Sequence, residues 1–574
     1  MNISRREFLQ MLALASAAGV HLPGMAKTAN NNPMRAMYDI PKFGNVSLMH
    51  FTDCHAQLMP IWFREPNINI GVGIMDGRPP HLVGPHLLHY YKIKNNTPAA
   101  HAFTYLDFVE AGKKYGKVGG FAHLATLVKQ IRASRPGALL LDGGDTWQGS
   151  ATSLWTNAQD MVDACKMLGV NVMTGHWEFT FGADRVKEIL NNDLKDHIDF
   201  VAQNVIDKEW EEAVFKPYVI KEINGVPVAI IGQAFPYTPI ANPSHLIPDW
   251  SFGIRDDSMQ KYVDKARKEG AKVVVVLSHN GMDVDIKMAS RVSGIDAIFG
   301  GHTHDAVPEP FVVKNKGGKT LVINSGSNGK FLSVLDLDVR GGKINNYAFS
   351  LLPVFSNFLD ADPEMESYIK KVREPFEAQL NEPLGVADEL LYRRGNFNGT
   401  FDQLILDAAM YVQDADIAFS PGFRWGVSVM PGEHITREHL MSQTAITYPT
   451  VTLTRMDGEN IKLILEDVAD NLFNADPYYQ QGGDMVRVGG LKFAIDPTKP
   501  IGKRITDMEL KGKKISADKK YRVAGWASVQ KPREGQPIWE IVEEYMLSQD
   551  TIKIKEVNVP KIVGIKNNLG YVKE

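Results

Sequence analysis

The sequence predicts an α/β protein built from two domains, and three observations support this fold class. The chain has 574 residues, more than one hydrophobic core ordinarily organises, so two domains are expected. In its first half, short unbroken apolar runs alternate with stretches of helical periodicity, which is the pattern of a layered α/β domain. After Pro353 the chain becomes charged and helical and then mixed in pattern, which indicates a linker followed by a second domain.

The first 30 residues are interpreted as a twin-arginine signal peptide. Residues 4–9 read Ser-Arg-Arg-Glu-Phe-Leu, and an apolar stretch of about ten residues follows at 11–20. That stretch is too short to span a bilayer, so no membrane association is expected. A chance arginine pair ahead of an apolar helix is the alternative. Because the twin-arginine route serves export, we expect a mature protein that begins near residues 27–33 and works in a bacterial periplasm.

The first domain is predicted over residues 40–355, with five buried strands and four helices. The apolar runs expected to form strands are residues 46–51, 138–141, 170–173, 273–277 and 297–299. The intervening segments expected to be helical are residues 121–134, 159–168, 183–191 and 258–269. Apolar runs without alternation suit strands that are covered on both faces. A layered α/β domain follows.

The rest of the chain is predicted to be a linker over residues 356–383 and a mixed α/β domain over 384–574. Residues 361–380 are charged and helical, with Pro363 near the start and Asn-Glu-Pro at 381–383 as a stop signal. In the second domain, helices are expected near 401–412 and 458–471, and strands near 492–495, 521–525 and 561–563.

Charge and cysteine content exclude several classes of protein. The net charge is −4 and no basic tract occurs, so nothing indicates nucleic-acid binding. Two cysteines, Cys54 and Cys165, are too few for a disulfide framework or a cysteine-based zinc site. One disulfide between them is possible, and two buried free thiols are favoured. We expect a monomer.

Polar residues with metal-binding side chains follow each of the five predicted strands. The carboxyl ends of strands in α/β sheets are where ligands bind, and residues i and i+2 of a strand point to the same side. A mixed set of carboxylate and imidazole ligands suits Mn²⁺, Zn²⁺ or Fe²⁺, and a shared carboxylate permits two ions about 4 Å apart. The candidate metal ligands are Asp53, His55, Asp145, His176, His279, His302 and His304.

The ordered motifs Asp-x-His, Gly-Gly-Asp, Gly-His-x-Glu, Ser-His-Asn-Gly and Gly-His-Thr-His resemble those of the calcineurin-like metallophosphoesterases, and the two-domain length resembles the periplasmic 5′-nucleotidases. The resemblance implies a four-layer α/β catalytic domain with two metal ions, Mn²⁺ by family, and a substrate-binding C-terminal domain. It also implies catalytic roles for Asp145 and His279. The ligand sets it implies are Asp53, His55, a bridging Asp145 and His304 for one ion, and His176, His279 and His302 for the other.

The C-terminal domain carries its own matches. Residues 419–424, Phe-Ser-Pro-Gly-Phe-Arg, resemble the family's substrate loop, which implies that Arg424 binds the substrate anion, since arginine presents a planar fork to an oxyanion. A surface salt bridge is the alternative role for Arg424. Tyr478 and Tyr479 lie where the nucleotidases hold the base between aromatic rings, so they are candidate substrate-binding residues.

The stretch Gly-His-Trp-Glu-Phe-Thr at 175–180 departs from the nucleotidase motif Gly-Asn-His-Glu-x-Asp. His176 replaces a ligand Asn, while Trp177 and Thr180 replace a catalytic His–Asp pair. This pattern resembles the SoxB thiosulfohydrolases of the sulfur-oxidising Sox system. The resemblance implies release of sulfate from a cysteine S-thiosulfonate on a SoxYZ-type carrier, with a dimetal-bound hydroxide as nucleophile. Trp177 is expected to act at the site by lining the passage for the carrier arm, and a core packing role is the alternative.

The leaving group gives a chemical reason for the missing histidine. Thiols have a pKa near 8.5, far below that of an alkoxide, so a persulfide thiolate needs little help from a general acid. Two other functions stay open. One is a periplasmic 5′-nucleotidase or cyclic phosphodiesterase that works without the His–Asp pair. The other is a non-catalytic binding protein, which the intact ligand set argues against.

Overall fold

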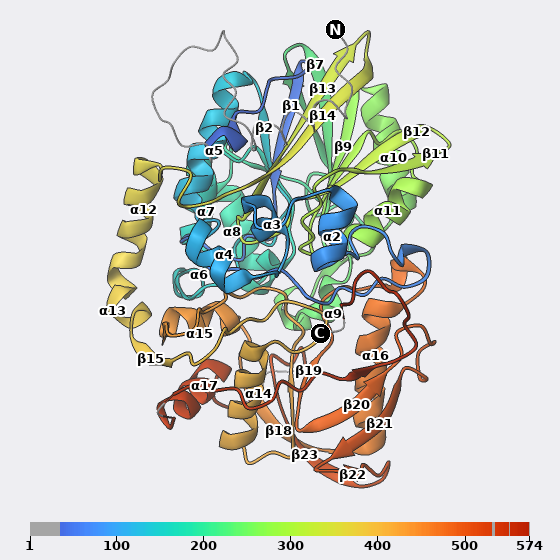
Figure 1. The fold of residues 1–574 in the computed structure, drawn as a ribbon. Helices are drawn as coiled ribbons and strands as arrows, with labels where there is room; N and C mark the ends of the chain where they lie inside the picture. The colour runs from blue at the N-terminus through green and yellow to red at the C-terminus, as the bar shows by residue number, and fades with distance from the viewer. Residues whose placement is uncertain (1–34, 531–533, 550, 573–574) are drawn as a thin grey trace. The chain divides into compact units, whose positions relative to one another are not determined.

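The structure is a computed structural model that describes residues 35–530, 534–549 and 551–572 (Figure 1). Residues 42–574 form one compact unit, and the helical turn η1 (Arg35–Tyr38) belongs to a separate N-terminal unit. The predicted signal peptide over residues 1–30 lies outside the described residues. Among the described helices, none has the length and apolar character needed to cross a bilayer.

The first domain contains a six-stranded sheet in the order β14-β13-β1-β2-β3-β4. Strands β1 to β4 are parallel, whereas β13 pairs antiparallel with both β1 and β14. The strands are β1 (Val46–Phe51), β2 (Leu139–Asp142), β3 (Val172–Met173), β4 (Asp199–Phe200), β13 (Phe331–Arg340) and β14 (Lys343–Pro353). The long β13–β14 hairpin was not among the predicted strands.

A second six-stranded sheet has the order β11-β12-β10-β9-β7-β6. Its four central strands are parallel, and hairpin partners close both edges antiparallel. The strands are β6 (Tyr218–Ile223), β7 (Val226–Gln233), β9 (Val273–Ser278), β10 (Ala297–Gly300), β11 (Phe311–Asn315) and β12 (Gly318–Asn324). The side chains of the two sheets meet in one core, which includes Val46, Leu141, Val275 and Phe299.

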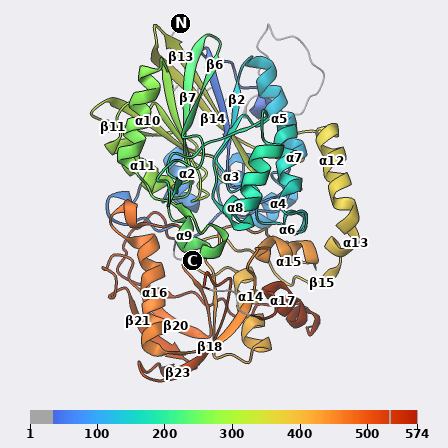
Figure 2. The ribbon, with the colours of Figure 1, turned by 180° about the vertical axis from the view of Figure 1, so that it is seen from behind.

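Helices cover the outer face of each sheet, so the domain has four layers (Figures 1 and 2). On one side lie α5 (Phe121–Ser134), α7 (Gln159–Leu168) and α8 (Ala183–Glu188), which a π-helical turn (Ile189–Asp193) extends. On the other side lie α10 (Asp256–Lys268) and α11 (Met282–Arg291), which pack on the second sheet. The predicted α/β class is confirmed, with the helices over 121–134 and 159–168 ending at the predicted residues.

Shorter elements complete the first domain. They are α6 (Ala151–Thr156), η3 (Trp177–Phe181), β5 (Ile206–Asp207), α9 (Thr238–Ala241), η5 (Ser244–Leu246) and β8 (Trp250–Ser251). Cys54 and Cys165 are both buried free thiols, as the sequence favoured.

The segment between β1 and α5 connects to both halves of the unit. It contains η2 (Gly73–Met75), α2 (Gly84–Tyr91), α3 (Pro98–Phe103) and α4 (Phe108–Tyr115). Glu65 in this segment forms a buried ion pair of 2.7 Å with Lys330 of the first domain. Ile68 bridges to Tyr571, near the other end of the chain. The segment therefore ties the first domain to the C-terminal part.

The predicted linker helix is present but broken. Helix α12 (Pro363–Arg373) is followed by the turn η6 (Glu374–Phe376) and α13 (Glu377–Leu380). Pro375 lies at the break, where its missing N–H and its ring interrupt a continuous helix.

The C-terminal part has two four-stranded sheets, β18-β23-β16-β19 and β22-β21-β20-β24, and a two-stranded ladder of β15 and β17. The strands are β15 (Pro383–Val386), β16 (Ile417–Ser420), β17 (His434–Thr436), β18 (Val451–Asp457), β19 (Arg487–Gly489), β20 (Leu491–Ile495), β21 (Ile505–Leu510), β22 (Lys513–Lys514), β23 (Lys520–Trp526) and β24 (Lys561–Ile562). The helices are α14 (Thr400–Val412), α15 (Arg437–Thr444), α16 (Gly458–Phe473), η7 (Pro477–Tyr479) and α17 (Ile538–Leu547). The exact domain boundaries named from the sequence stay predictions.

Candidate metal centre

All seven candidate ligands converge at the carboxyl ends of the strands, in the two groups that the motifs predicted. His176, His279 and His302 form one group. Asp53, His55, Asp145 and His304 form the other. Within each group the candidate ligand atoms lie within 4.8 Å of one another, and every residue is buried.

The way the ligands converge differs from the prediction. Strand β1 ends at Phe51, so Asp53 and His55 do not share a strand face. Both have positive φ, 52° and 47°, and His302 and His304 do too, at 73° and 57°. Left-handed backbone is uncommon for residues other than glycine and clusters at functional sites. Tight loops, rather than strand alternation, therefore aim these side chains at one point.

Several polar atoms of the candidate ligand residues have no hydrogen bond in this buried site, which fits bound cations. Asp145 Oδ1, His176 Nδ1, His279 Nε2 and His304 Nδ1 lack a partner. His279 directs its other nitrogen, Nδ1, at the carbonyl of Gly143 at 2.7 Å, which leaves Nε2 free for a metal. The Nε2 atoms of His55 and His304 face each other at 3.0 Å. Buried polar atoms normally have partners, and these donors define a dinuclear metal site.

The electrostatics of the site keep most of its imidazole rings neutral, which is the form that binds a metal. Burial holds the pKa of His55, His176, His302 and His304 well below the usual value, so these rings are neutral, as metal binding requires. Burial also acts to lower the pKa of His279, but Asp53 and Asp145 outweigh it and raise that pKa to about 9. A pair of buried carboxylates that attracts a proton to His279 attracts a divalent cation in the same way.

Glu178 connects the two loops that carry Asp145 and His176, a function that the sequence reasoning did not assign. Its fully buried carboxylate accepts hydrogen bonds from four backbone N–H groups. The donors are Asp145 N at 3.1 Å, Thr146 N at 2.7 Å, Trp147 N at 3.3 Å and His176 N at 2.7 Å. Bonds from N–H groups to a carboxylate are the strong, charge-assisted kind. Glu178 therefore sets the spacing of one ligand from each metal group.

A cavity of about 310 Å³ opens beside the metal groups, and aromatic side chains form much of its wall. Trp177 is only 7% exposed and belongs to an apolar core cluster, yet it also lines the cavity. Its ring meets the rings of Phe423 and Trp425 edge to face, with centroids 5.5 Å away in each case. Phe423 and Trp425 stack on each other at 3.9 Å. Both roles considered for Trp177, core packing and lining of the passage, are therefore present together.

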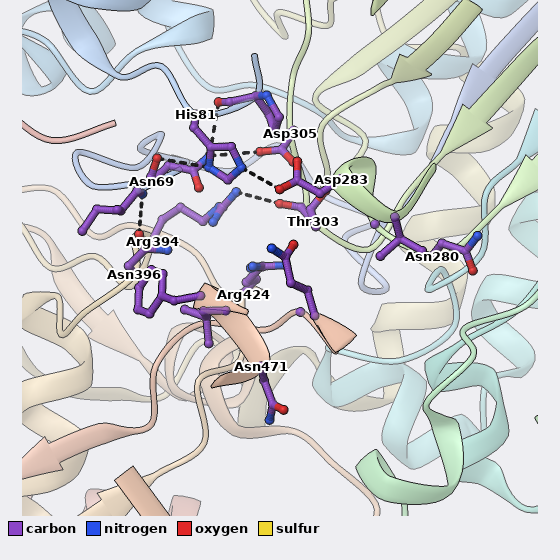
Figure 3. Close-up of a pocket in the computed structure, with 18 residues that line it drawn as sticks. Asn69, His81, Asn280, Asp283, Thr303, Asp305, Arg394, Asn396, Arg424 and Asn471 are labelled. Carbon is purple, nitrogen blue, oxygen red and sulfur yellow. Dashed lines mark hydrogen bonds and ion pairs between the residues drawn. The ribbon is translucent and has the colours of Figure 1, made fainter. Parts of the chain in front are cut away.

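Arg424 reaches the site from the C-terminal domain. Its side chain is only 11% exposed, pairs with Asp484 at 3.5 Å and lines the main cavity, so the ion pair considered for Arg424 is present but buried rather than at the surface. It donates to the carbonyls of His302, at 3.3 Å, and of Gly483. Arg424 also lines a smaller cavity of about 50 Å³, where Arg394, His81 and Asp283 are its neighbours (Figure 3).

The structure does not bring Tyr478 or Tyr479 to the main cavity, judged on the described residues. The Tyr478 hydroxyl donates to Asp256 at 3.3 Å, and Lys287 sits over its ring at 4.0 Å. Tyr479 is 64% exposed. The cavity is instead lined by Phe423 and Trp425, which flank Arg424 and could have been found as aromatic neighbours of that residue in the sequence. Other wall residues that were missed include Phe235, Tyr237, Tyr448 and the chain segment from Gln481 to Gly483.

Two family models match the chain in the order of its domains. The calcineurin-like phosphoesterase family matches residues 46–306, and the 5′-nucleotidase C-terminal domain family matches residues 383–540. Bovine 5′-nucleotidase is 25% identical over 435 residues, which cover 68% of this chain and 73% of the bovine protein.

Solved structures agree with this assignment. The sulfate thiohydrolase SoxB of Thermus thermophilus, in complex with glycerol, is 36% identical with a TM-score of 0.87 and covers 92% of this chain and 98% of its own. A 5′-nucleotidase precursor from Thermus thermophilus shares the fold at 21% identity, with a TM-score of 0.71 over 91% of this chain and all of its own. With its dinuclear metal site on this two-domain fold, the chain is a hydrolase and belongs to the 5′-nucleotidase and calcineurin-like metallophosphoesterase superfamily.

Proposed function

We propose that this protein is a SoxB-type thiosulfohydrolase, which releases sulfate from a cysteine S-thiosulfonate on a SoxYZ-type carrier protein. The likeness to the Thermus thermophilus sulfate thiohydrolase supports this reading. The observation that carries it lies in the cavity, where Trp177 occupies the position of the catalytic histidine of the nucleotidases.

The cavity wall offers no spare general acid among the described residues, because the carboxylate of its Asp484 is paired with Arg487 at 2.9 Å and with Arg424 at 3.5 Å. Thr180, at the position of the Asp of the nucleotidase pair, donates its hydroxyl to the Trp177 carbonyl at 2.8 Å. The hydroxyls of Tyr237 and Tyr448 donate to the carbonyls of Tyr478 and Ala241, and burial raises the pKa of both phenols. The lining histidines belong to the metal groups. A reaction at this site must therefore expel a leaving group that needs little protonation.

A persulfide meets that requirement. The reaction is R–S–S–SO₃⁻ + H₂O → R–S–S⁻ + SO₄²⁻ + 2H⁺. The bond between the middle sulfur and the sulfonate sulfur breaks, and its electron pair leaves with the persulfide. Two bound divalent cations would lower the pKa of the attacking water and offset charge on the sulfonate oxygens. Arg424 places a positive guanidinium at the same cavity, where it can attract and orient the sulfonate. Trp177, Phe423 and Trp425 exclude water around the sulfur chain.

The shape of the cavity also indicates what kind of substrate it accepts. Phe423 and Trp425 contact each other face to face at 3.9 Å, so no nucleobase fits between them. A slender peptide arm suits this aromatic wall, and we propose a monomeric enzyme that receives such an arm. The same proposal includes Mn²⁺ as the metal, which suits the nitrogen and oxygen ligands. It also includes export by the twin-arginine route and action in the periplasm, which the sequence of residues 4–9 suits.

A substrate comparison tests the proposal. Manganese-loaded protein is given, in parallel, a glycine-rich peptide with a cysteine S-thiosulfonate, AMP, and a cyclic nucleotide. Sulfate is measured by ion chromatography and phosphate by a colorimetric assay. We expect kcat/KM for the thiosulfonate peptide to exceed that for AMP by at least about 100-fold, on the order of what a missing general acid costs a phosphate ester. Faster turnover of either nucleotide would favour the nucleotidase or cyclic phosphodiesterase function, which the curated 5′-nucleotidase relatives support.

A further inference from the structure

A short strap of the C-terminal domain, residues 480–483, lies directly on the metal ligand His302. The backbone carbonyl of Gln481 contacts His302 Nε2 at 3.1 Å. A Cβ atom added to Gly482 would come within 2.2 Å of the same nitrogen and 2.6 Å of His302 Cδ2. The strap therefore touches the Nε2 edge of the ring, and only glycine permits so close an approach.

Two largely buried arginines of the C-terminal domain hold the backbone of the same loop. Arg394 Nη2 donates to the carbonyls of Thr303 and His304, each at 3.3 Å, and Arg424 Nη1 donates to that of His302 at 3.3 Å. Three consecutive carbonyls of the loop thus accept from the other domain. Figure 3 shows Arg394 reaching Thr303 of this loop, with Arg424 nearby in the same cavity.

The contact at Nε2 decides how His302 can bind a metal. A carbonyl accepts, so the Nε2 atom that faces Gln481 must carry the proton, and Nδ1 is then the nitrogen with a free lone pair. His302 and His304 both have positive φ, a conformation that lasts only where surrounding contacts hold it. The described contacts that do so include the strap and the two arginines.

We propose that Gln481, Gly482 and Arg394 are positioning residues for the metal loop, so that the C-terminal domain sets the metal affinity of the group His176, His279 and His302. The domain that carries the substrate loop thereby also completes the support of the metal centre. This inference concerns metal binding alone and holds whichever ester the enzyme cleaves.

The two neighbouring glycines of the strap provide a matched test. Gly482 and Gly483 have nearly the same backbone, with φ of 74° and 78°, so alanine costs similar strain at either position. A Cβ at Gly483 would meet its nearest neighbour, Gly422 O, only at 3.6 Å. Gly482→Ala and Gly483→Ala therefore differ in one respect, the collision with His302.

Metal binding is measured by equilibrium dialysis of each variant against Mn²⁺, with metal determined by mass spectrometry and the unfolding temperature of the chelated protein recorded. We expect Gly482→Ala to lower the affinity for one of the two Mn²⁺ ions by about 10–100-fold, the usual cost of disturbing a partner of a metal ligand. The affinity for the other ion should not change. Gly483→Ala should stay within about threefold of the parent at both ions.

Equal affinities in the two glycine variants would overturn the proposal, as would an equal weakening of both ions in Gly482→Ala. Arg394→Met provides a second route should Gly482→Ala not fold, because it removes the donors to Thr303 and His304 and keeps the side-chain stem. Because His302 and His304 share this loop but belong to different groups, it should weaken the binding of one or both ions by about tenfold, and an unchanged affinity for both ions would also contradict the proposal. Since no substrate is present in these measurements, their outcome is independent of the substrate comparison described above.

Discussion

The floor and the wall of the catalytic cavity are built in different ways. The floor consists of metal-binding side chains, and five of the seven candidate ligands line the cavity. Each of the seven follows a strand of the first domain at a position marked by a short motif. The wall combines Trp177 with Phe423, Trp425 and residues 481–483 of the strap, which come from distant parts of the chain. Floor residues obey local chemistry, whereas wall residues depend on how two domains pack. Motifs therefore report the reaction type more directly than the substrate.

The largest effect is expected from the floor. Asp145→Asn removes the charge of the carboxylate that lies within reach of both His55 and His279, at 3.4 Å and 3.7 Å. Loss of at least one ion and a fall in kcat of more than about 100-fold are expected, because even outer partners of metal ligands cost 10–100-fold. Metal analysis and sulfate release check this. Asp163→Asn, which alters a partly exposed ion pair with Lys166, is the control and should change neither.

Glu178→Gln tests whether the metal ligands of the floor depend on the hydrogen bonds that Glu178 accepts from the backbone. The amide would direct a donor at backbone N–H groups that are themselves donors, which leaves buried polar groups unpaired. We expect metal affinity to fall by about 10–100-fold and the unfolding free energy to fall by about 1–3 kcal/mol. Denaturant titration of the chelated protein measures the second quantity. Glu188→Gln, which affects a half-exposed ion pair with Arg185, should shift it by less than about 0.5 kcal/mol; similar losses in the two variants would contradict the role of Glu178.

Trp177→His tests the leaving-group argument at the wall. The smaller ring leaves a gap against Phe423 and Trp425, and the unfolding free energy should fall by about 2–4 kcal/mol. Sulfate release from the thiosulfonate peptide should not rise, since a persulfide gains little from an added acid. A gain of about tenfold or more would remove the chemical reason for a tryptophan here. Trp210→His at a 70% exposed site controls for loss of the indole as such.

The smallest effect is expected at the tyrosine that the sequence placed in the substrate site. Tyr479 is 64% exposed and outside the cavity, so Tyr479→Ala should leave kcat/KM within about twofold. Phe423→Ala, which opens the wall beside Trp177, should lower it by about tenfold, or about 1.4 kcal/mol. Steady-state kinetics on the peptide substrate compare the two. A larger loss for Tyr479→Ala than for Phe423→Ala would mean that the substrate path extends past the cavity.

Different amounts of the fold and of the site were accessible from sequence. The helices over 121–134 and 159–168 were predicted to the residue, because amphipathic periodicity and end signals are local. The β13–β14 hairpin was missed, although it forms one edge of the first sheet. Its outer strand begins with exposed and half-buried residues and is buried only over its last three residues, a weaker signal than the continuous apolar runs of the central strands. Glu178 was visible in its motif, but only the packed loops show that its carboxylate joins them.

The sequence by itself determined the α/β class, the identity of the seven metal-binding side chains and the replacement of the catalytic His–Asp pair by Trp177 and Thr180. Those features reside in short stretches whose residue types dictate their chemistry. The tertiary structure alone decided which candidate ligands gather in each of the two groups, that Tyr479 lies outside the cavity, and that the strap over His302 belongs to the other domain. Such contacts join residues far apart in the chain, as between His302 and Gln481, and no local preference of the chain specifies them.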